Sequence, residues 1–320
     1  MIRIIVAISL LFISTPSFAT EQIKRTQFIL NQLGYNVGLI DGIYGSKTNK
    51  ALKKFYKNKN EKFDGTLDNN EINDLEDSYE RLFINFPKSE KWNQDWNWDF
   101  EVNCLLPNKK SIQILKEDKN YFVRVQLDNK DIGGCPSDND KEHGLKFNKP
   151  YSERAEVTGK KTDFQKNKNY LIQFKIRFVT GFNTKRRSET FFQIKDCPTS
   201  VVPVMAKIGE MLENRRLFVF DLGSGSKKGR VRRSTSPKYN PIDNNWNLIK
   251  IYFHTGSPNK IKIYFNDHLL LKETTFPNVM NCDGTDFRIG IYRAGNKGYF
   301  GNPLSIVDYD EVNINFTDPF

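Results

Sequence analysis

The sequence is poor in the residue types that most often bind metal ions. Its 320 residues include only four cysteines and three histidines. No two cysteines have the C-x-x-C spacing, which argues against a zinc site. Beyond the N-terminus, no segment approaches the roughly 18 consecutive apolar residues of a membrane-spanning helix, so no membrane span is expected.

The longest apolar run lies at the N-terminus. Arg3 precedes apolar residues 4–13, and small residues lead up to Ala19. This pattern is typical of a secretory signal peptide covering residues 1–19, so the protein is expected in the periplasm or outside the cell. In such an oxidising compartment an even number of cysteines favours two disulfides. Three pairings exist, and closeness along the chain favours Cys104–Cys135 with Cys197–Cys282.

Positive charge exceeds negative charge. The chain has 49 Lys and Arg against 38 Asp and Glu, a formal net charge of +11. A basic exported protein is suited to polyanions such as acidic polysaccharide, cell wall or lipid headgroups. Nucleic acid is a second kind of polyanion, but export argues against it. The alternative is that these charges form only a solvated surface.

The N-terminal part of the mature chain has helical periodicity. Residues 20–76 contain three short segments with apolar residues on one face, and Gly34 ends the first of them. We therefore expect a small three-helix bundle. Residues 77–100 form a junction rich in tryptophan, which is either a buried seam, the first strand of the next domain or a platform for sugar stacking.

From residue 101 to residue 320 the pattern changes to short alternating segments separated by Gly, Pro, Asn and Asp. No long amphipathic helix interrupts them, so we expect an all-β jelly-roll (concanavalin A-like) sandwich of antiparallel strands. The basic segment 223–238 is expected to be a loop, either a lid over an anionic ligand or simply solvated. The expected strands are 121–127, 151–157, 169–179, 189–195, 216–222, 247–254, 260–265, 286–292 and 307–316.

Several of these strands have an apolar face and a face of hydrogen-bonding side chains. In YSERAEV (151–157), Arg154 and Glu156 alternate with Ala155 and Val157. If such strands share a sheet, they form a cationic groove suited to an extended chain of carboxylated sugars, because Arg holds a carboxylate with two parallel hydrogen bonds. The alternative is ordinary cross-strand ion pairs. The expected substrate-binding residues are Glu156, which would orient Arg154, and Lys175, Arg177, Arg288 and Arg293.

The helical segment resembles the peptidoglycan-binding-like domain. The family pattern is Q-x-x-L-x-x-L-G-Y followed by D-G-x-x-G-x-x-T-x-x-A-L-x-x-F. The resemblance implies a contact with peptidoglycan, while most of these residues would hold the fold; a bundle without a wall ligand is the alternative. The matching residues are Gln27, Leu30, Leu33-Gly34-Tyr35, Asp41-Gly42, Gly45, Thr48, Ala51-Leu52 and Phe55.

The β segment resembles jelly-roll polysaccharide lyases. Arg154-Ala155-Glu156, Gln193-Ile194-Lys195 and the run from Phe287 to Tyr292 correspond to the R-x-E, Q-I-H and Y-F-K-A-G-x-Y motifs of alginate lyases. SERAEV, RIGIYR and DYDEV are more similar to the heparin lyase I-like group. The E-x-D-x-x-E pair of carboxylates of glucanases is absent, which disfavours a two-carboxylate hydrolase.

The resemblance implies β-elimination on a uronic-acid polysaccharide without a cofactor, and it leaves a structural Ca²⁺ open. Arg154 and Gln193 would neutralise the substrate carboxylate, and Tyr292 would be the acid, or acid and base both. Lys195 replaces the family histidine; it is a base if its pKa is depressed and a carboxylate clamp otherwise. His143 could supply the missing imidazole, and Tyr299 is a second candidate tyrosine. The rival functions are a non-catalytic carbohydrate-binding protein and a wall-associated structural protein.

Overall fold

The computed structural model divides the chain into two compact units, residues 1–79 and residues 80–320, each treated separately below. No helix among the described residues is long and apolar enough to cross a membrane. The structure describes residues 18–81, 97–98, 100–102, 106–128, 131–134, 152–159, 164–182, 189–195, 202–212, 215–224, 230–237, 241–277, 285–293 and 304–319.

The first unit is the expected three-helix bundle. Its helices are α1 (Phe18–Gln32), α2 (Ser46–Asn58) and α3 (Asn69–Glu80). They bury a small apolar core that includes Leu30, Leu52, Phe55 and Leu75. Gly34 follows α1 with φ +84°, a left-handed conformation that suits a glycine at a helix C-terminus.

A buried glutamine holds the turn between α1 and α2. The Gln27 amide nitrogen donates to the Asp41 carboxylate over 2.8 Å, and its oxygen accepts from the Gly42 N–H over 2.9 Å. Gly42 has φ +78°, and a Cβ there would lie 2.7 Å from the Thr20 methyl carbon. The Gln, Asp and Gly of the motif therefore stabilise the fold of this turn.

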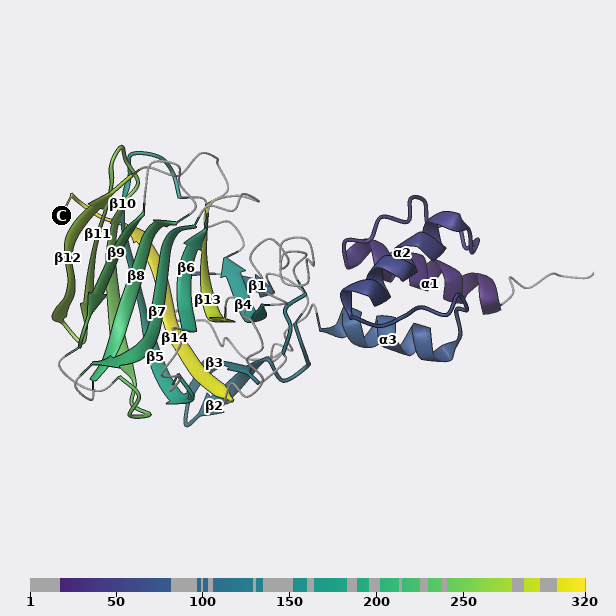
Figure 1. Cartoon of the computed structure of the whole chain (residues 1–320), viewed down its shortest axis with the longest axis horizontal. Helices are drawn as coiled ribbons and strands as arrows, with labels where there is room; N and C mark the ends of the chain where they lie inside the picture. The colour runs from purple at the N-terminus through teal and green to yellow at the C-terminus, as the bar shows by residue number, and fades with distance from the viewer. Residues whose placement is uncertain are drawn as a thin grey trace, which may run out of the picture. The chain divides into compact units, whose positions relative to one another are not determined.

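The second unit is a jelly-roll sandwich of two antiparallel seven-stranded sheets (Figure 1). The first sheet has the order β1-β4-β13-β6-β7-β8-β9. Its strands are β1 (Phe100–Val102), β4 (Glu153–Gly159), β6 (Glu189–Lys195), β7 (Val202–Leu212), β8 (Arg215–Ser224), β9 (Val231–Thr235) and β13 (Asp286–Arg293).

The second sheet has the order β12-β11-β10-β5-β14-β3-β2. Its strands are β2 (Ile112–Glu117), β3 (Asn120–Leu127), β5 (Asn169–Thr180), β10 (Asn247–His254), β11 (Asn259–Phe265), β12 (His268–Phe276) and β14 (Ser305–Phe316). All the strands predicted from alternation are present.

The core between the sheets is rich in phenylalanine. Phe174 of the second sheet lies against Phe192 and Phe287 of the first, with ring centroids 5.8 Å apart in both pairs. Because side chains alternate along a strand, the residues between these core positions point away from the other sheet. The polar residues that alternate with these core positions, among them Arg154, Gln193 and Arg288, therefore share one outer face.

One expectation about a loop needs correction, and the bounds of the junction 77–100 stay a prediction. Among the described residues, α3 continues to Glu80 and the buried Trp98 packs on Phe100 and Phe287. The basic segment 223–238 is not wholly a loop, because residues 231–235 form β9 and pair with β8.

Candidate active site

Three adjacent strands bring the predicted lyase residues together. Strand β13 lies between β4 and β6. Tyr292 of β13 is paired with Arg154 of β4, and Arg288 of β13 is paired with Gln193 of β6. Arg154, Gln193 and Tyr292 come from distant parts of the sequence, so the sheet order is what gathers them on one face.

Glu156 links the two expected carboxylate-neutralising residues. One of its carboxylate oxygens accepts from Arg154 Nη1 over 2.6 Å, and the other accepts from Gln193 Nε2 over 2.7 Å. All three side chains are buried, although they point away from the apolar core. As expected from the sequence, Glu156 orients Arg154, and it also orients Gln193. The amide nitrogen of Gln193 has a second hydrogen that it can donate to a ligand.

Tyr292 lies directly beside Arg154. The guanidinium carbon is 4.2 Å from the centroid of the tyrosine ring, a close cation–π contact. The Tyr292 hydroxyl is 3.5 Å from the Ser152 Oγ. A phenol that can exchange a proton thus lies next to a guanidinium that can bind a carboxylate.

The backbone between Tyr292 and Gln193 is irregular. Gly290 is paired with Glu156 and has φ +140°, and a Cβ there would lie 2.3 Å from the carbonyl oxygen of Ala155. The Gln193–Glu156 hydrogen bond joins β6 to β4 across β13, at the level where Gly290 presents no side chain. Sequence reasoning gave this glycine no role, although its place in the motif was visible.

Two β-bulges lie near Gly290, and a tyrosine of the second sheet stabilises both of them. The ladder between β13 and β6 shifts register between Ile289 and Tyr292, and the ladder between β6 and β7 shifts next to Phe191. The buried hydroxyl of Tyr309 on β14 lies 2.5 Å from the Phe191 carbonyl oxygen and 3.0 Å from that of Gly290. It also accepts from the Gly290 N–H over 3.2 Å. Sequence reasoning did not identify Tyr309.

Lys195 lies on the same face but at the other end of it. It is paired with Asp286, whereas Thr190 of the same strand is paired with Tyr292. Five residues of strand correspond to about 16 Å. Burial, and then the positive charges of Arg288 and Arg154, lower the pKa of Lys195. Lys195 therefore has the depressed pKa that a base needs, although its backbone lies several residues along the strand from the level of Tyr292.

Arg288 shares this end of the face. Its guanidinium donates two hydrogen bonds to the Asp286 carboxylate, over 2.6 and 2.8 Å. Arg288 is thus already paired with a carboxylate, and with Lys195 it makes this end of the site cationic.

Lys175 and Arg177 are not part of this site, which corrects the expectation that their strand shares the sheet of Arg154. They lie on β5 in the second sheet. Arg177 Nη1 donates to Glu117 over 2.8 Å, and its Nε donates to Asp308 over 2.9 Å. Lys175 is paired with Glu311. Alternation along one strand cannot reveal which sheet the strand joins.

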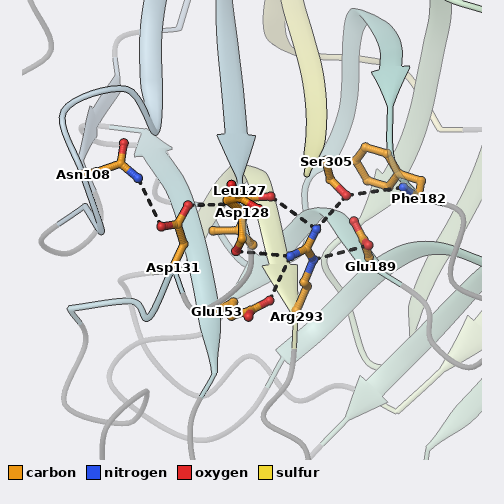
Figure 2. Close-up of polar contacts among 9 residues, drawn as sticks. All are labelled: Asn108, Leu127, Asp128, Asp131, Glu153, Phe182, Glu189, Arg293 and Ser305. Atoms are coloured by element: carbon orange, nitrogen blue, oxygen red, sulfur yellow. Dashed lines mark hydrogen bonds and ion pairs between the residues drawn. The ribbon is translucent and has the colours of Figure 1, made fainter. Parts of the chain in front are cut away.

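Arg293 also lies outside the site, on the opposite face of β13 from Tyr292. Figure 2 shows its guanidinium between Glu153 and Glu189, at 2.9 and 3.3 Å, with the Ser305 hydroxyl 2.7 Å away. Burial raises the pKa of the Glu189 carboxyl. The expectation that Arg293 binds substrate is wrong, because this arginine is buried inside the sandwich and forms ion pairs with Glu153 and Glu189.

Several predicted features fall outside the described residues. They are His143, Tyr299 and all four cysteines, so the base role of His143 and the disulfide pairing stay predictions. Among the residues that are described, no group of three or more His, Cys, Asp and Glu is placed to hold a metal ion.

The jelly-roll sandwich gathers arginine, glutamine and tyrosine on the polar face of one sheet, an arrangement that suits the binding or cleavage of an acidic polysaccharide. The chain belongs to the polysaccharide lyase family, whose model matches residues 107–313 and hence more than half of the chain. Residues 20–74 match a second model, described as "putative peptidoglycan binding domain". The narrower likeness to the heparin lyase I-like group stays a prediction.

Solved structures of lyases resemble the chain at low identity. A glucuronan lyase from the fungus Trichoderma reesei has 14% identity and a TM-score of 0.47, covering 69% of this chain and 92% of that one. An alginate lyase from Pseudomonas aeruginosa has 13% identity and a TM-score of 0.43, covering 63% of this chain and 88% of that one. No curated protein matches the chain.

Proposed function

We propose that this polysaccharide lyase is exported and cleaves a uronic-acid-containing polysaccharide by β-elimination. The observation that carries the proposal is the bonded set of Arg154, Glu156 and Gln193 with the Tyr292 ring stacked on Arg154. The net charge of +11 supports an acidic polymer as substrate.

The reaction requires a base, a proton donor and groups that neutralise the substrate carboxylate. A base removes the proton at C5 of the uronate, a double bond forms between C4 and C5, and the bond from C4 to the bridging oxygen breaks. The bridging oxygen then takes up a proton. The C5 proton becomes acidic only when the adjacent carboxylate is neutralised, because negative charge builds up on that carboxylate in the transition state.

The bound uronate is proposed to lie over Gly290. Arg154 and the second amide hydrogen of Gln193 bind its carboxylate there, with Glu156 holding both donors in position. Tyr292 protonates the leaving oxygen. Tyr292 also serves as the base, in its deprotonated form. Lys195, whose backbone lies about 16 Å along the strand from the level of Tyr292, clamps a carboxylate.

The second part of the proposal is that the helical unit binds the cell wall. Its match to a peptidoglycan-binding model supports retention of the enzyme at the cell wall. The signal-like N-terminus supports a periplasmic or secreted location.

Ultraviolet absorbance tests the chemistry. The mature protein is incubated with alginate, glucuronan and a sulfated glycosaminoglycan, because β-elimination leaves a conjugated unsaturated uronate that absorbs and hydrolysis does not. We expect absorbance to rise on at least one polymer. Tyr292→Phe should lower kcat at least about 100-fold, the usual contribution of a general acid or base, while the affinity for the polymer is kept.

Tyr264→Phe is the matched control, because Tyr264 lies on β11 in the second sheet. It should leave kcat unchanged. Binding without any rise in absorbance would overturn the lyase proposal in favour of a non-catalytic carbohydrate-binding protein. An unchanged kcat in Tyr292→Phe would remove this tyrosine from the mechanism.

A further inference from the structure

A cationic cluster lies on β7, β8 and β9, toward the edge of the first sheet. Its centre is the buried carboxylate of Asp221, whose side chain is 3% exposed. One oxygen of Asp221 accepts from Lys207 Nζ over 2.6 Å. The other is 3.9 Å from the Nε atoms of both Arg230 and Arg232 and accepts no hydrogen bond.

The cluster has more positive charge than its carboxylate can neutralise. Lys207, Arg230 and Arg232 bring three positive charges to one negative charge. The two arginine side chains are 51% and 49% exposed, and no hydrogen bond from either to another described side chain is present. Asp221 thus lies within 3.9 Å of the Nε atoms of two arginines whose side chains are about half exposed.

The cluster lies on the same face as the candidate active site. Paired residues in adjacent strands share a face, and the pairs run from Gln193 to Met205, from Met205 to Asp221 and from Asp221 to Arg232. Four strand spacings separate β13 from β9, which at about 4.8 Å each gives about 19 Å. An extended oligosaccharide of several sugar units spans that distance.

We propose that Arg230 and Arg232 form a distal subsite, which binds a carboxylate of the acidic polysaccharide several sugar units from the bond that is cleaved. The inference rests on the proposed function, because it takes the same polymer as ligand. The carboxylate would bridge the two guanidiniums, while Asp221 positions them and Lys207 offsets the charge of Asp221. A guanidinium suits this role because its planar donors match a carboxylate.

The chain offers a matched control on the same strand. Arg233 follows Arg232 and is also exposed, but it is paired with Phe220, whose side chain lies in the core between the sheets. Arg233 therefore lies on the other face of β9. Arg233→Ala removes one positive charge from the same strand, half of what the double variant removes, without touching the proposed subsite.

The experiment compares alginate polymer with alginate trisaccharide, which is too short to reach β9 from Tyr292. For the polymer, the double variant Arg230→Ala, Arg232→Ala should raise KM about tenfold, as expected for the loss of a charge-assisted contact, and leave kcat unchanged. The trisaccharide should bind the double variant and the wild type equally. Arg233→Ala should behave as the wild type with both ligands.

Binding to alginate in affinity electrophoresis separates this inference from the proposed function. If no polyuronate is cleaved, the lyase proposal fails, and weaker retention of the double variant alone still supports the subsite. Equal retention of the wild type and the double variant overturns the subsite even where cleavage is seen. Equal weakening by Arg233→Ala, or equal weakening toward the trisaccharide, overturns it in favour of a general charge effect.

Discussion

At the scale of single residues, Glu156 is a buried carboxylate that needs hydrogen-bond partners. It is 3% exposed, and each of its oxygens accepts a hydrogen bond from a residue expected to contact the substrate. A buried carboxylate is stable only when it is paired and hydrogen-bonded. Arg154 and Gln193 supply those partners, so the same contacts that stabilise Glu156 also fix the positions of the two donors.

Lys195 gives a prediction about pH. Because burial and the nearby Arg288 and Arg154 lower its pKa, it loses its positive charge at a lower pH than an ordinary lysine does. If Lys195 clamps a substrate carboxylate, affinity falls as pH rises through that lowered pKa. The KM of the wild type should therefore increase in this window, with kcat changing little.

Two variants of Lys195 test whether the increase of KM with pH comes from the loss of its positive charge. Lys195→Arg keeps its charge throughout, so its KM should stay low as pH rises. Lys195→Gln should have a high KM that does not depend on pH in the same window. A kcat that rises with pH in the wild type and is lost in both variants would contradict the clamp and make Lys195 the base.

At the scale of elements, the site depends on two bulged strands. A bulge re-aims side chains and leaves backbone groups without their ladder partners. The Tyr309 hydroxyl reaches from β14 across the core to the carbonyl oxygens of Phe191 and Gly290, at the bulges of β6 and β13. The second sheet thus stabilises the backbone on which Tyr292 and Gln193 are mounted.

Tyr309→Phe should lower both stability and turnover. Removing the hydroxyl leaves buried carbonyl groups unpaired, which costs about 1–3 kcal/mol of the free energy of unfolding. The bulges should then relax and displace Tyr292, so kcat should fall while KM stays near the wild-type value. Chemical denaturation and steady-state kinetics, at a temperature where both proteins are folded, measure the two effects.

Tyr170→Phe separates a local effect from a general loss of stability. Tyr170 is also buried and also lies in the second sheet, on β5, but its hydroxyl accepts a hydrogen bond from the Gln165 N–H over 2.7 Å instead of bonding to the bulged strands. This control should lose stability and keep its kcat. A similar fall of kcat in both variants would contradict a positioning role for Tyr309.

Some strands could be predicted from the alternation of apolar and polar residues, and others could not. Alternation in β5, β10 and β11 was clear because one face of each strand is buried. Strand β7 was missed because Pro203 and Gly209 interrupt its pattern, and β9 was missed because its exposed arginines are typical of a loop. Sheet membership is a property of long-range pairing, so the expectation put Arg177 in the wrong sheet.

The motifs predicted which residues the sheet gathers in the candidate site, and the roles of these residues stay predictions. Arg154, Gln193 and Tyr292 were found through motifs, since their residue types and order are local features of the sequence. The expectation for Arg293 is wrong because Arg293 directly follows Tyr292, and successive side chains of a strand lie on opposite faces. Tyr309 and Gly290 were missed because their importance depends on which atoms lie opposite them in space.

At the scale of the whole molecule, the chain combines two units with separate cores. The helical unit buries Leu30, Leu52 and Phe55, and the sandwich has its own aromatic core. Each core is formed by residues of one unit only, so each unit should fold without the other. This separation allows wall binding and cleavage to be tested independently.

Deletion of residues 20–76 should abolish retention on the cell wall and leave cleavage intact. The mature protein and the deletion variant are sedimented with isolated peptidoglycan and then assayed on soluble polymer. We expect only the full chain to sediment, with equal kcat/KM for both. Full-length Tyr292→Phe is the reciprocal control and should sediment without cleaving. Sedimentation of the deletion variant would contradict a wall-binding role for the helical unit, whereas a loss of kcat/KM on deletion would contradict the independence of the sandwich.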